Sequence, residues 1–484
     1  MDATWMAAGD LAAAVRARKV SSAELLEHFR KRVELHNPRI NAVVVFDWER
    51  AKERAAWADA ALAGGTPTGP LHGVPMTVKE CFDVEGLPTT AGHVGLKANA
   101  ALRHADAVRR LLDAGAVIFG KTNTPLFAGD FQTYNEVYGT TNNPWDLTLG
   151  PGGSSGGSAA ALAAGMTPME LGSDIGGSIR NPAHFCGVYG HKPSYGVVSL
   201  RGHVPGPPNS LNLPDIAVAG PLTRNADDLD LALSVLAGPG EWDAAAWRID
   251  LPAPRRTSLA DYRIAICPDD AFCPVDSEIA DAISRAGDAL AKAGAAVRAS
   301  KPAIDFAASF RLFYRMLAAT LAPGYDDGLL DQLAAGAKAA ADQQAMSALF
   351  MRGATMRHVD YVRAEAARQD ERARWADFFT GYDVFLCPIV MTAAFAHDHS
   401  PDIQGRRLKV NGAERGYLEA IGWAGLIGNV RLPSTVVPVG HTKAGLPIGM
   451  QVVGPYLEDR TCIDVARHLE RAIGGFTPPA GYDA

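Results

Sequence analysis

Two segments rich in glycine and serine, together with one lysine, are the strongest candidates for chemistry in this chain. The segments are residues 152–158 and 172–180, and Lys79 ends an apolar run that begins at residue 73. Dense glycine favours special backbone dihedrals or close approach of the backbone to another group. A serine becomes a nucleophile when a base takes its proton, and a buried lysine with a lowered pKa can be that base. The pattern therefore indicates a nucleophilic hydrolase that needs no histidine.

Residues 115–122 match the phosphate-loop pattern G-x-x-x-x-G-K-[ST]. A phosphate loop needs a flexible backbone whose N–H groups converge on an anion. The variable positions here include Val117, Ile118 and Phe119, which favour a buried strand. We interpret this match as accidental.

Residues 152–156 also match G-x-S-x-G, the nucleophile elbow of α/β-hydrolases, which would make Ser154 the nucleophile. That motif needs a strand directly before it and an Asp and a His later in the chain. The preceding residues 142–146, Asn-Asn-Pro-Trp-Asp, are typical of turns, and no pattern singles out one of the later histidines. The elbow remains a competing interpretation.

Taken together, several segments resemble the amidase signature family of serine hydrolases. The matching segments are residues 73–80 around Lys79, 115–125, 151–158, 172–180, 187–194 and 432–454. The resemblance spans residues 10–475; it is strongest over residues 70–240 and weakest over 240–420. Agreement over so many separate segments identifies the chain as similar to this family rather than to a chance motif.

The resemblance implies a catalytic role for each of three residues. Ser178 is the nucleophile that forms an acyl-enzyme, and Ser154 passes its proton to Lys79. The family's peptide bond before the relay serine is cis, which would be Gly153–Ser154 here. Lys79 must be neutral to accept a proton, so burial must lower its pKa from about 10.4. We expect activity to rise into the alkaline range.

Residues beside the nucleophile are expected to stabilise charge or to support the loops. The backbone N–H groups of Ile175, Gly176, Gly177 and Ser178 are candidates for an oxyanion hole, because consecutive glycines permit a tight turn. Ser155 and Asp174 are expected to brace the loops through hydrogen bonds. Two alternatives stay open for Arg180, which either meets a substrate carboxylate or pairs structurally with a nearby carboxylate or carbonyl. His184, His191 and His203 are expected to be structural.

The elements that must position these residues alternate between helices and short apolar strands, which predicts an α/β sheet covered by helices on both faces. Ser21 and Glu24 form a capping pattern for a helix that reaches about residue 35 and stops at Asn37-Pro38. Further helices are expected at residues 48–63, 103–114, 158–164, 224–237 and 459–473, and strands at 40–46, 74–78, 117–119, 384–386, 435–439 and 448–453. The resemblance implies a central mixed sheet.

We predict one large domain over residues 1–484. Its catalytic core covers about residues 65–240, and a variable, largely helical region on the substrate side covers about residues 240–420. Strands and a helix within residues 421–475 are expected to rejoin the core.

Composition excludes several classes of protein. A net charge of −7 over 484 residues, with 20% charged residues, gives no support for nucleic-acid binding. The six cysteines are scattered without a CxxC pair, which favours buried thiols in a reducing compartment over disulfides or zinc. Neither a signal peptide nor a membrane-spanning run is evident, so we expect a cytoplasmic protein without membrane partners. No cofactor or metal is predicted.

The leading functional hypothesis is an amidase acting on a small-molecule amide, with esters and carbamates also within chemical reach. The alternative is one component of a tRNA-dependent glutamine amidotransferase, making ammonia for a partner enzyme; residues 127–130, Phe-Ala-Gly-Asp, depart from that branch's [ED]-F-x-[MF]-G pattern. A catalytically dead scaffold is a third hypothesis, which the presence of all three catalytic residues disfavours. A homodimer is left open. Loop residues that would set substrate choice are Phe127, Tyr134, Tyr138 and Trp423, which core packing explains equally well.

Overall fold

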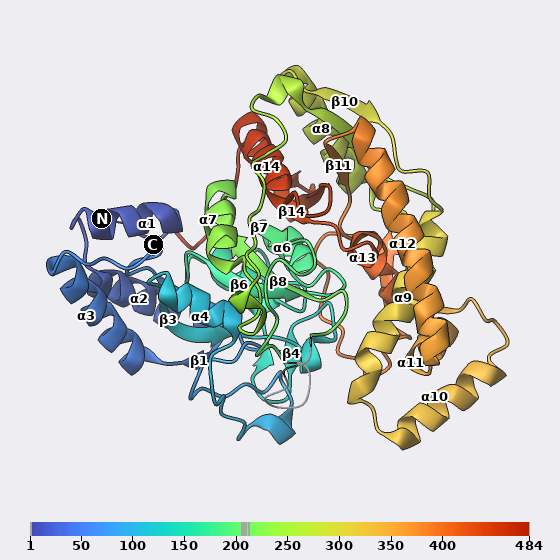
Figure 1. The fold of residues 1–484 in the computed structure, drawn as a ribbon, viewed down its shortest axis with the longest axis horizontal. Helices are drawn as coiled ribbons and strands as arrows, with labels where there is room; N and C mark the ends of the chain where they lie inside the picture. Colours follow the sequence, from blue (N-terminus) through green and yellow to red (C-terminus); the bar gives the residue numbers. More distant parts are fainter. Residues whose placement is uncertain (1, 205–210, 212, 484) are drawn as a thin grey trace.

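Short apolar runs along the chain form the strands of one large mixed sheet (Figure 1). The computed structural model describes residues 2–204, 211 and 213–483, and within them this sheet has 11 strands. Their order across the sheet is β1-β3-β2-β6-β8-β7-β14-β15-β11-β9-β10. The strands are β1 (Val43–Phe46), β2 (Pro75–Lys79), β3 (Val117–Thr122), β6 (Glu170–Asp174), β7 (Tyr189–Lys192), β8 (Val218–Thr223), β9 (Arg263–Ile266), β10 (Ala296–Ala299), β11 (Val384–Cys387), β14 (Ser434–His441) and β15 (Pro447–Val453).

The directions of two central strands decide where the catalytic candidates meet. β2 runs parallel to both β3 and β6, with Val78 opposite Leu171 in β6. Parallel strands end at the same edge of a sheet, so Lys79 at the end of β2 lies beside the end of β6. The middle of the sheet, from β6 through β8, β7, β14, β15 and β11, is antiparallel.

Helices cover both faces of this sheet, as predicted. Helices α5 and α6 pack against each other, and every residue of both is buried. Close packing of α5 is possible because it consists almost entirely of glycine and alanine beside Ser158 and Leu162. Helices α7 and α8 pack against α14 beside β8 and β14. Their bounds are α1 (Ala8–Arg16), α2 (Ser22–Ile40), α3 (Trp48–Ala63), α4 (Asp106–Asp113), α5 (Gly156–Ala163), α6 (Arg180–Cys186), α7 (Ala226–Leu236), α8 (Ser277–Lys292), α13 (Gly422–Asn429) and α14 (Asp459–Ile473).

Helix α2 shows where the local sequence signals succeed and where one fails. Its predicted capping box is present, with Ser21 and Glu24 satisfying each other's backbone N–H groups. The prediction that Asn37-Pro38 stops the helix is wrong, because α2 continues through Pro38 to Ile40. The amide oxygen of Asn37 accepts the N–H groups of residues 42 and 43, and this fastens the last turn despite the missing proline N–H.

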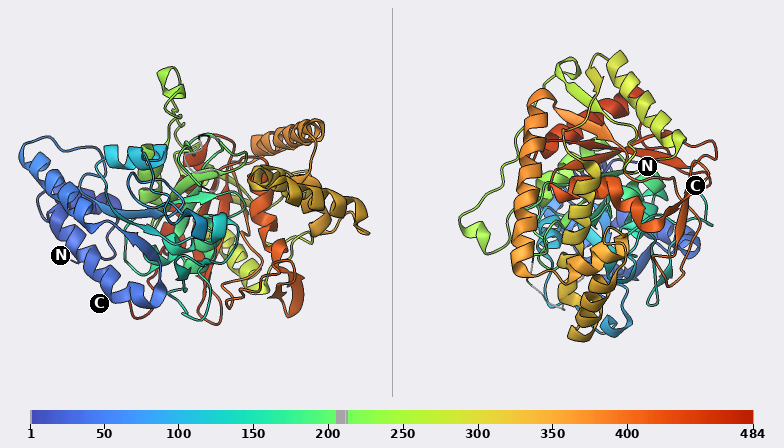
Figure 2. Two further views of the ribbon diagram at one scale, coloured as in Figure 1. Left: turned by 90° about the horizontal axis from the view of Figure 1, so that it is seen from below. Right: turned by 90° about the vertical axis from the view of Figure 1, so that its right-hand side faces the viewer.

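The region of residues 240–420 contributes more to the sheet than the sequence predicts. Besides its helices it supplies β9, β10 and β11, which form one edge of the central sheet. The other helices of this region form a separate group, coloured yellow to orange, at one end of the molecule (Figure 2), where α9 packs against α13. They are α9 (Phe306–Leu321), α10 (Asp327–Ala339), α11 (Met346–Ala354) and α12 (His358–Gly381), followed by a hairpin of β12 (Arg407–Val410) and β13 (Ala413–Gly416).

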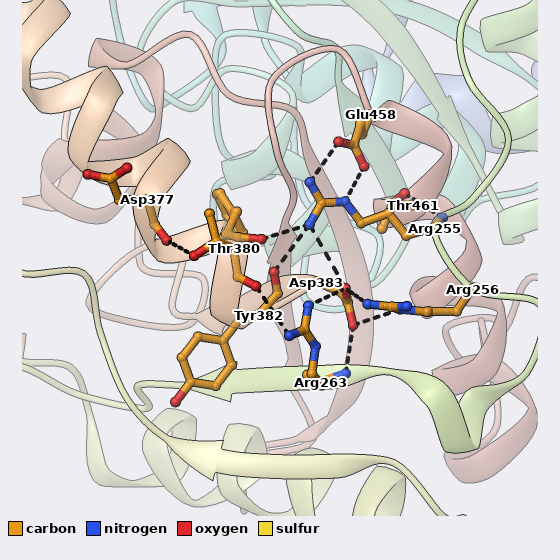
Figure 3. Close-up of polar contacts among 10 residues, drawn as sticks. Arg255, Arg256, Arg263, Asp377, Thr380, Tyr382, Asp383, Glu458 and Thr461 are labelled. Carbon is orange, nitrogen blue, oxygen red and sulfur yellow. Dashed lines mark hydrogen bonds and ion pairs between the residues drawn. The ribbon is translucent and has the colours of Figure 1, made fainter.

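A cluster of arginines joins this region to the sheet at the end of α12 (Figure 3). Buried Asp383 accepts hydrogen bonds from the Arg256 guanidinium at 2.8 Å and from the backbone N–H of Arg263 at 2.8 Å. Arg255 donates to the carbonyl of Phe379 at 2.8 Å and to Glu458 at 2.8 Å. Burial alone would raise the pKa of Asp383, but the hydrogen bonds from the arginines lower it. The cluster therefore holds a charged carboxylate where β9, β11, α12 and α14 meet.

Other features of the chain complete the fold. The six cysteines are all buried and free, as predicted. The two ends of the chain lie side by side, as the N and C marks show in Figures 1 and 2. The Arg32 guanidinium of α2 donates to the carbonyl of Tyr482 at 2.7 Å. Within the described part of the chain, no helix combines the length and the apolar character needed to span a membrane.

Candidate active site

Lys79 lies completely buried at the end of β2, where it contacts two serine hydroxyls. Its Nζ donates to Ser154 Oγ at 2.6 Å and to Ser173 Oγ at 3.0 Å. Burial disfavours the charged ammonium and lowers the pKa of Lys79 to about 8. A substantial fraction of this lysine is therefore neutral near pH 8, as a general base requires.

Ser154 lies in the tight turn that precedes α5. The peptide bond between Gly153 and Ser154 is cis, as the resemblance implies. Gly152 has a φ of +83°, and a Cβ at Gly153 would lie 2.4 Å from the carbonyl oxygen of Asp130. Glycine is required at both positions, because a side chain would be strained at the first and would clash at the second.

The carboxylate of Asp174 organises the loop that carries Ser178. It accepts the backbone N–H groups of Gly177 at 2.8 Å and Ile179 at 3.1 Å, and it pairs with Arg180 at 2.9 Å. Burial alone would raise the pKa of Asp174, but the charge and hydrogen bonds of Arg180 lower it to about 2. A charged carboxylate therefore fixes the conformation of residues 174–180, which wrap around it through these hydrogen bonds.

The hydrogen bonds to Asp174 determine which backbone N–H groups of this loop remain free to bind an oxyanion. Gly177, with a φ of +114°, gives its N–H to Asp174. The N–H groups of Ile175, Gly176 and Ser178 make no hydrogen bond to any residue that the structure describes. The loop thus offers three free donors, and of the predicted set Gly177 is the one already engaged.

Ser155 joins the two serine loops. Its backbone N–H donates to the carbonyl of Ser178 at 3.0 Å, and its hydroxyl donates to the carbonyl of Ser173 at 3.3 Å. Both contacts agree with the expected bracing role. Among the described residues, the hydroxyls of Ser154 and Ser178 share no direct hydrogen bond, so the loops are held together here through backbone.

Arg180 is completely buried, and its guanidinium is engaged on every side. Besides Asp174 it donates to the carbonyl of Ala424 at 2.9 Å and to the Gln451 side chain at 3.1 Å. These contacts match the structural alternative for Arg180, because they occupy four of its five N–H donors with protein acceptors.

An apolar cluster from the helical region covers the Ser178 loop. Phe313 of α9 and Ile421 lie against Gly176, where a Cβ would meet Ile421 at 2.5 Å and Phe313 at 3.8 Å. Ile175 packs on the same cluster, which consists of Ile216, Phe313, Tyr314, Leu317, Leu349 and Ile421. The free N–H groups of the loop therefore adjoin an apolar surface.

The predicted substrate-loop residues lie in different surroundings. Phe127 is 40% exposed, has a φ of +49° and stacks on His93 with ring centroids 4.9 Å apart. Tyr138 donates to Glu80 at 3.1 Å, and Tyr134 accepts from Arg406 at 2.7 Å. Trp423 is completely buried and donates to the carbonyl of Cys273, so core packing accounts for it.

The sequence placed all three nearby histidines in structural roles, and two of them have such contacts. His184 lies between the backbones of Gly449 and Thr392, and His191 bonds Thr435 and Asp459. His203 is different, because its Nε2 lies 2.8 Å from Ser173 Oγ, next to Lys79. Sequence reasoning missed both Ser173 and His203 as members of the site, since no local motif connects them.

The two competing motif matches find no structural support as functional sites. Residues 117–122 form buried strand β3, and Lys121 within it donates to the carbonyl of Pro88 and to Thr89. No strand directly precedes the turn at Ser154 in the described chain, as a nucleophile elbow requires. The described residues also contain no group of three or more His, Cys, Asp or Glu side chains placed to hold a metal ion.

A comparison with known proteins decides the family. The sequence profile described as Amidase matches residues 24–463. The chain belongs to the amidase family. This amidase-family chain is 32% identical over 481 residues to an acylamidase of Rhodococcus erythropolis, covering 96% of this chain and 95% of that protein. It is also 32% identical over 480 residues to a glutamyl-tRNA(Gln) amidotransferase subunit of Picosynechococcus sp., covering 94% and 96% of the two chains.

A solved structure gives the same result for the fold of this amidase-family member. The structure of a bacterial aryl acylamidase of the amidase signature family aligns with a TM-score of 0.81 and 27% identity, covering 97% of this chain and 96% of that one. The predicted family and fold class are both confirmed.

Proposed function

We propose that this chain hydrolyses the C–N bond of a small carboxylic amide through an acyl-enzyme on Ser178. The observation that carries the proposal is the buried side-chain nitrogen of Lys79, 2.6 Å from the Ser154 hydroxyl, beside a loop in which three N–H groups have no acceptor among the described residues. A base with a lowered pKa, a relay hydroxyl and an oxyanion site are the parts that acyl transfer needs.

In the proposed mechanism, neutral Lys79 takes the proton of Ser154, which takes the proton of Ser178. The Ser178 oxygen attacks the amide carbon, and the N–H groups of Ile175, Gly176 and Ser178 stabilise the oxyanion. The C–N bond then breaks, the proton held by Lys79 returns through Ser154 to the leaving nitrogen, and an ester on Ser178 remains. Water, activated by the same relay, hydrolyses that ester. Alignment of the Ser154 and Ser178 hydroxyls is expected in the substrate complex.

The apolar cluster next to Gly176 supports a substrate with an aromatic or aliphatic group beside its carbonyl. Arg180 is already engaged by Asp174, Ala424 and Gln451, so we do not expect a substrate carboxylate to be recognised there. The similarity to acylamidases fits this substrate class, and we regard aryl and alkyl amides as the first substrates to test.

The alternative, an amidotransferase component that releases ammonia from glutamine for a partner, has one specific observation in its favour. The relative of that class is as similar in sequence as the acylamidase is. The two functions differ in what the isolated chain does: an amidase turns over aryl amides alone, whereas the amidotransferase component is expected to act on glutamine with its partners.

The decisive experiment measures fluorophosphonate labelling and aryl-amide hydrolysis by the purified chain. We expect the wild type to label once and to be active, and Ser178→Ala to do neither. Ser284→Ala, on the exposed face of α8, is the control and should match the wild type. Labelling that persists in Ser178→Ala would overturn the assignment of the nucleophile.

A further inference from the structure

The hydrogen-bond chain of the site does not end at Lys79 but continues through Ser173 to His203. Lys79 Nζ and His203 Nε2 lie 3.0 Å and 2.8 Å from the same atom, Ser173 Oγ. Ser173 is 5% exposed, and His203, taken as a whole residue, is intermediate in exposure. The proposed mechanism uses neither residue.

Counting protons fixes the direction of this chain. A serine hydroxyl has one proton to give and two lone pairs that accept. Neutral Lys79 has two N–H groups and one lone pair. If Ser173 gave its proton to Lys79, that lone pair would be occupied and could not accept the proton of Ser154. If Ser173 gives its proton to His203, its oxygen accepts a Lys79 N–H, and the lone pair stays free.

The surroundings of His203 keep its imidazole neutral, and Nε2 accepts in the tautomer that carries its proton on Nδ1. Burial, and next the charge of Lys79, lower the pKa of His203 to about 3. The ring lies edge-on to Phe82 with centroids 4.8 Å apart. Charged or titratable groups on the segments beside it are Arg201 on its own segment, Lys79 at the end of β2, Glu80, Cys81 and Asp83 after that strand, and Asp174 next to Ser173.

We propose that His203 is a positioning residue for the general base: it accepts the Ser173 proton and thereby directs the Lys79 lone pair toward Ser154. This inference rests on the proposed function, because it assigns His203 a role only if Lys79 is the base. His203 acts through Ser173 and need not contact the substrate.

The test replaces His203 with Phe, which keeps an aromatic ring against Phe82 but removes the acceptor. We expect kcat for an aryl amide to fall about fivefold to tenfold with KM unchanged, well short of the loss of about 100-fold or more that removal of a general base causes. The rising limb of the pH profile should move to lower pH, because Ser173 then donates to neutral Lys79 and stabilises it. His203→Gln, whose amide oxygen can replace Nε2 as acceptor, should recover most of the loss.

The control variant is His468→Phe. His468 lies on α14, far from the site, and like His203 it is partly exposed and set edge-on to an aromatic ring, that of Tyr262. This variant should match the wild type. Melting temperatures are recorded for every variant, and if His203→Phe does not fold, His203→Asn, whose amide is too short to reach Ser173, takes its place.

A double-mutant cycle separates positioning from general packing. In a Ser173→Ala background, His203→Phe should cause no further loss of kcat, because the residue through which it acts is gone. An equal loss in both backgrounds, a change in KM alone, or unchanged kinetics of His203→Phe would overturn the inference. Ser178→Ala distinguishes the two proposals: if it is inactive while His203→Phe matches the wild type, only the role of His203 fails.

Discussion

The pH dependence of Ser178 labelling tests the base directly and needs no knowledge of the natural substrate. Burial lowers the pKa of Lys79 from 10.5 to about 8. With that pKa, about one-tenth of Lys79 is neutral at pH 7 and about nine-tenths at pH 9. Because only neutral Lys79 can accept a proton through Ser154, the labelling rate should rise about tenfold over this range and then level off.

The assay follows the second-order rate of fluorophosphonate labelling from pH 6 to 10, with intact mass used to count modified sites. Lys79→Met has nearly the same length as lysine but no base, so it should label slowly and supply the background for hydroxide-driven reaction. The reasoning is refuted if the wild-type rate is flat between pH 7 and 9. It is equally refuted if the rate is still rising steeply between pH 9 and 10, or if Lys79→Met gives the same profile.

Two further predictions concern stability and the oxyanion loop. Below pH 8, Lys79 is charged in both the folded and the unfolded protein, so its burial in the folded protein costs about 3 kcal/mol of stability. This cost disappears as the pH rises from 8 to 10.5, because Lys79 loses its proton first in the folded protein. Urea unfolding measures this: Lys79→Met should be more stable than the wild type at pH 8, and the difference in unfolding free energy should shrink by about 3 kcal/mol between pH 8 and 10.5. A difference that stays constant over this pH range would contradict the lowered pKa of Lys79. In Gly176→Ala the new Cβ would lie 2.5 Å from Ile421 Cδ1. We expect this clash to displace the oxyanion donors and to lower kcat about tenfold. The double variant Gly176→Ala/Ile421→Ala removes the clash and should recover part of the loss. Wild-type kcat in the single variant would show that Ile421 yields instead of the loop.

Local patterns were sufficient for much of the fold. The capping residues Ser21 and Glu24 mark the start of α2, and the Asn225 side chain caps α7 in the same local way, because capping involves residues only three apart. Helices α3 and α14 match their predicted ranges. In contrast, β10 has four residues with little burial and no alternation, so nothing in its sequence separates it from a loop; pairing with β9 makes it a strand.

The residues of the candidate site also fall into those that local motifs reveal and those that only the fold brings together. Lys79, Ser154 and Ser178 stand in dense motifs that the sequence shows directly. The choice between two roles for Arg180 depends on Gln451 and Ala424, which are hundreds of positions away in sequence and brought together by β15 and α13. His203 has no motif of its own, and only the return of the chain past Phe82 places it against Ser173.

The cluster around Asp383 has a consequence for how this protein can change over time. It anchors the base of α12 at β9 and β11, and the strands β8, β7, β14 and β15 separate β11 from β6. Five strand spacings of about 4.8 Å place this anchor roughly 24 Å from the strand that leads into the Ser178 loop. Substitutions in the parts of α9–α12 that do not touch Gly176 are therefore expected to accumulate while the anchor stays in place. Where Phe313 of α9 lies against Gly176, a substitution is instead expected to change substrate preference and the oxyanion donors together.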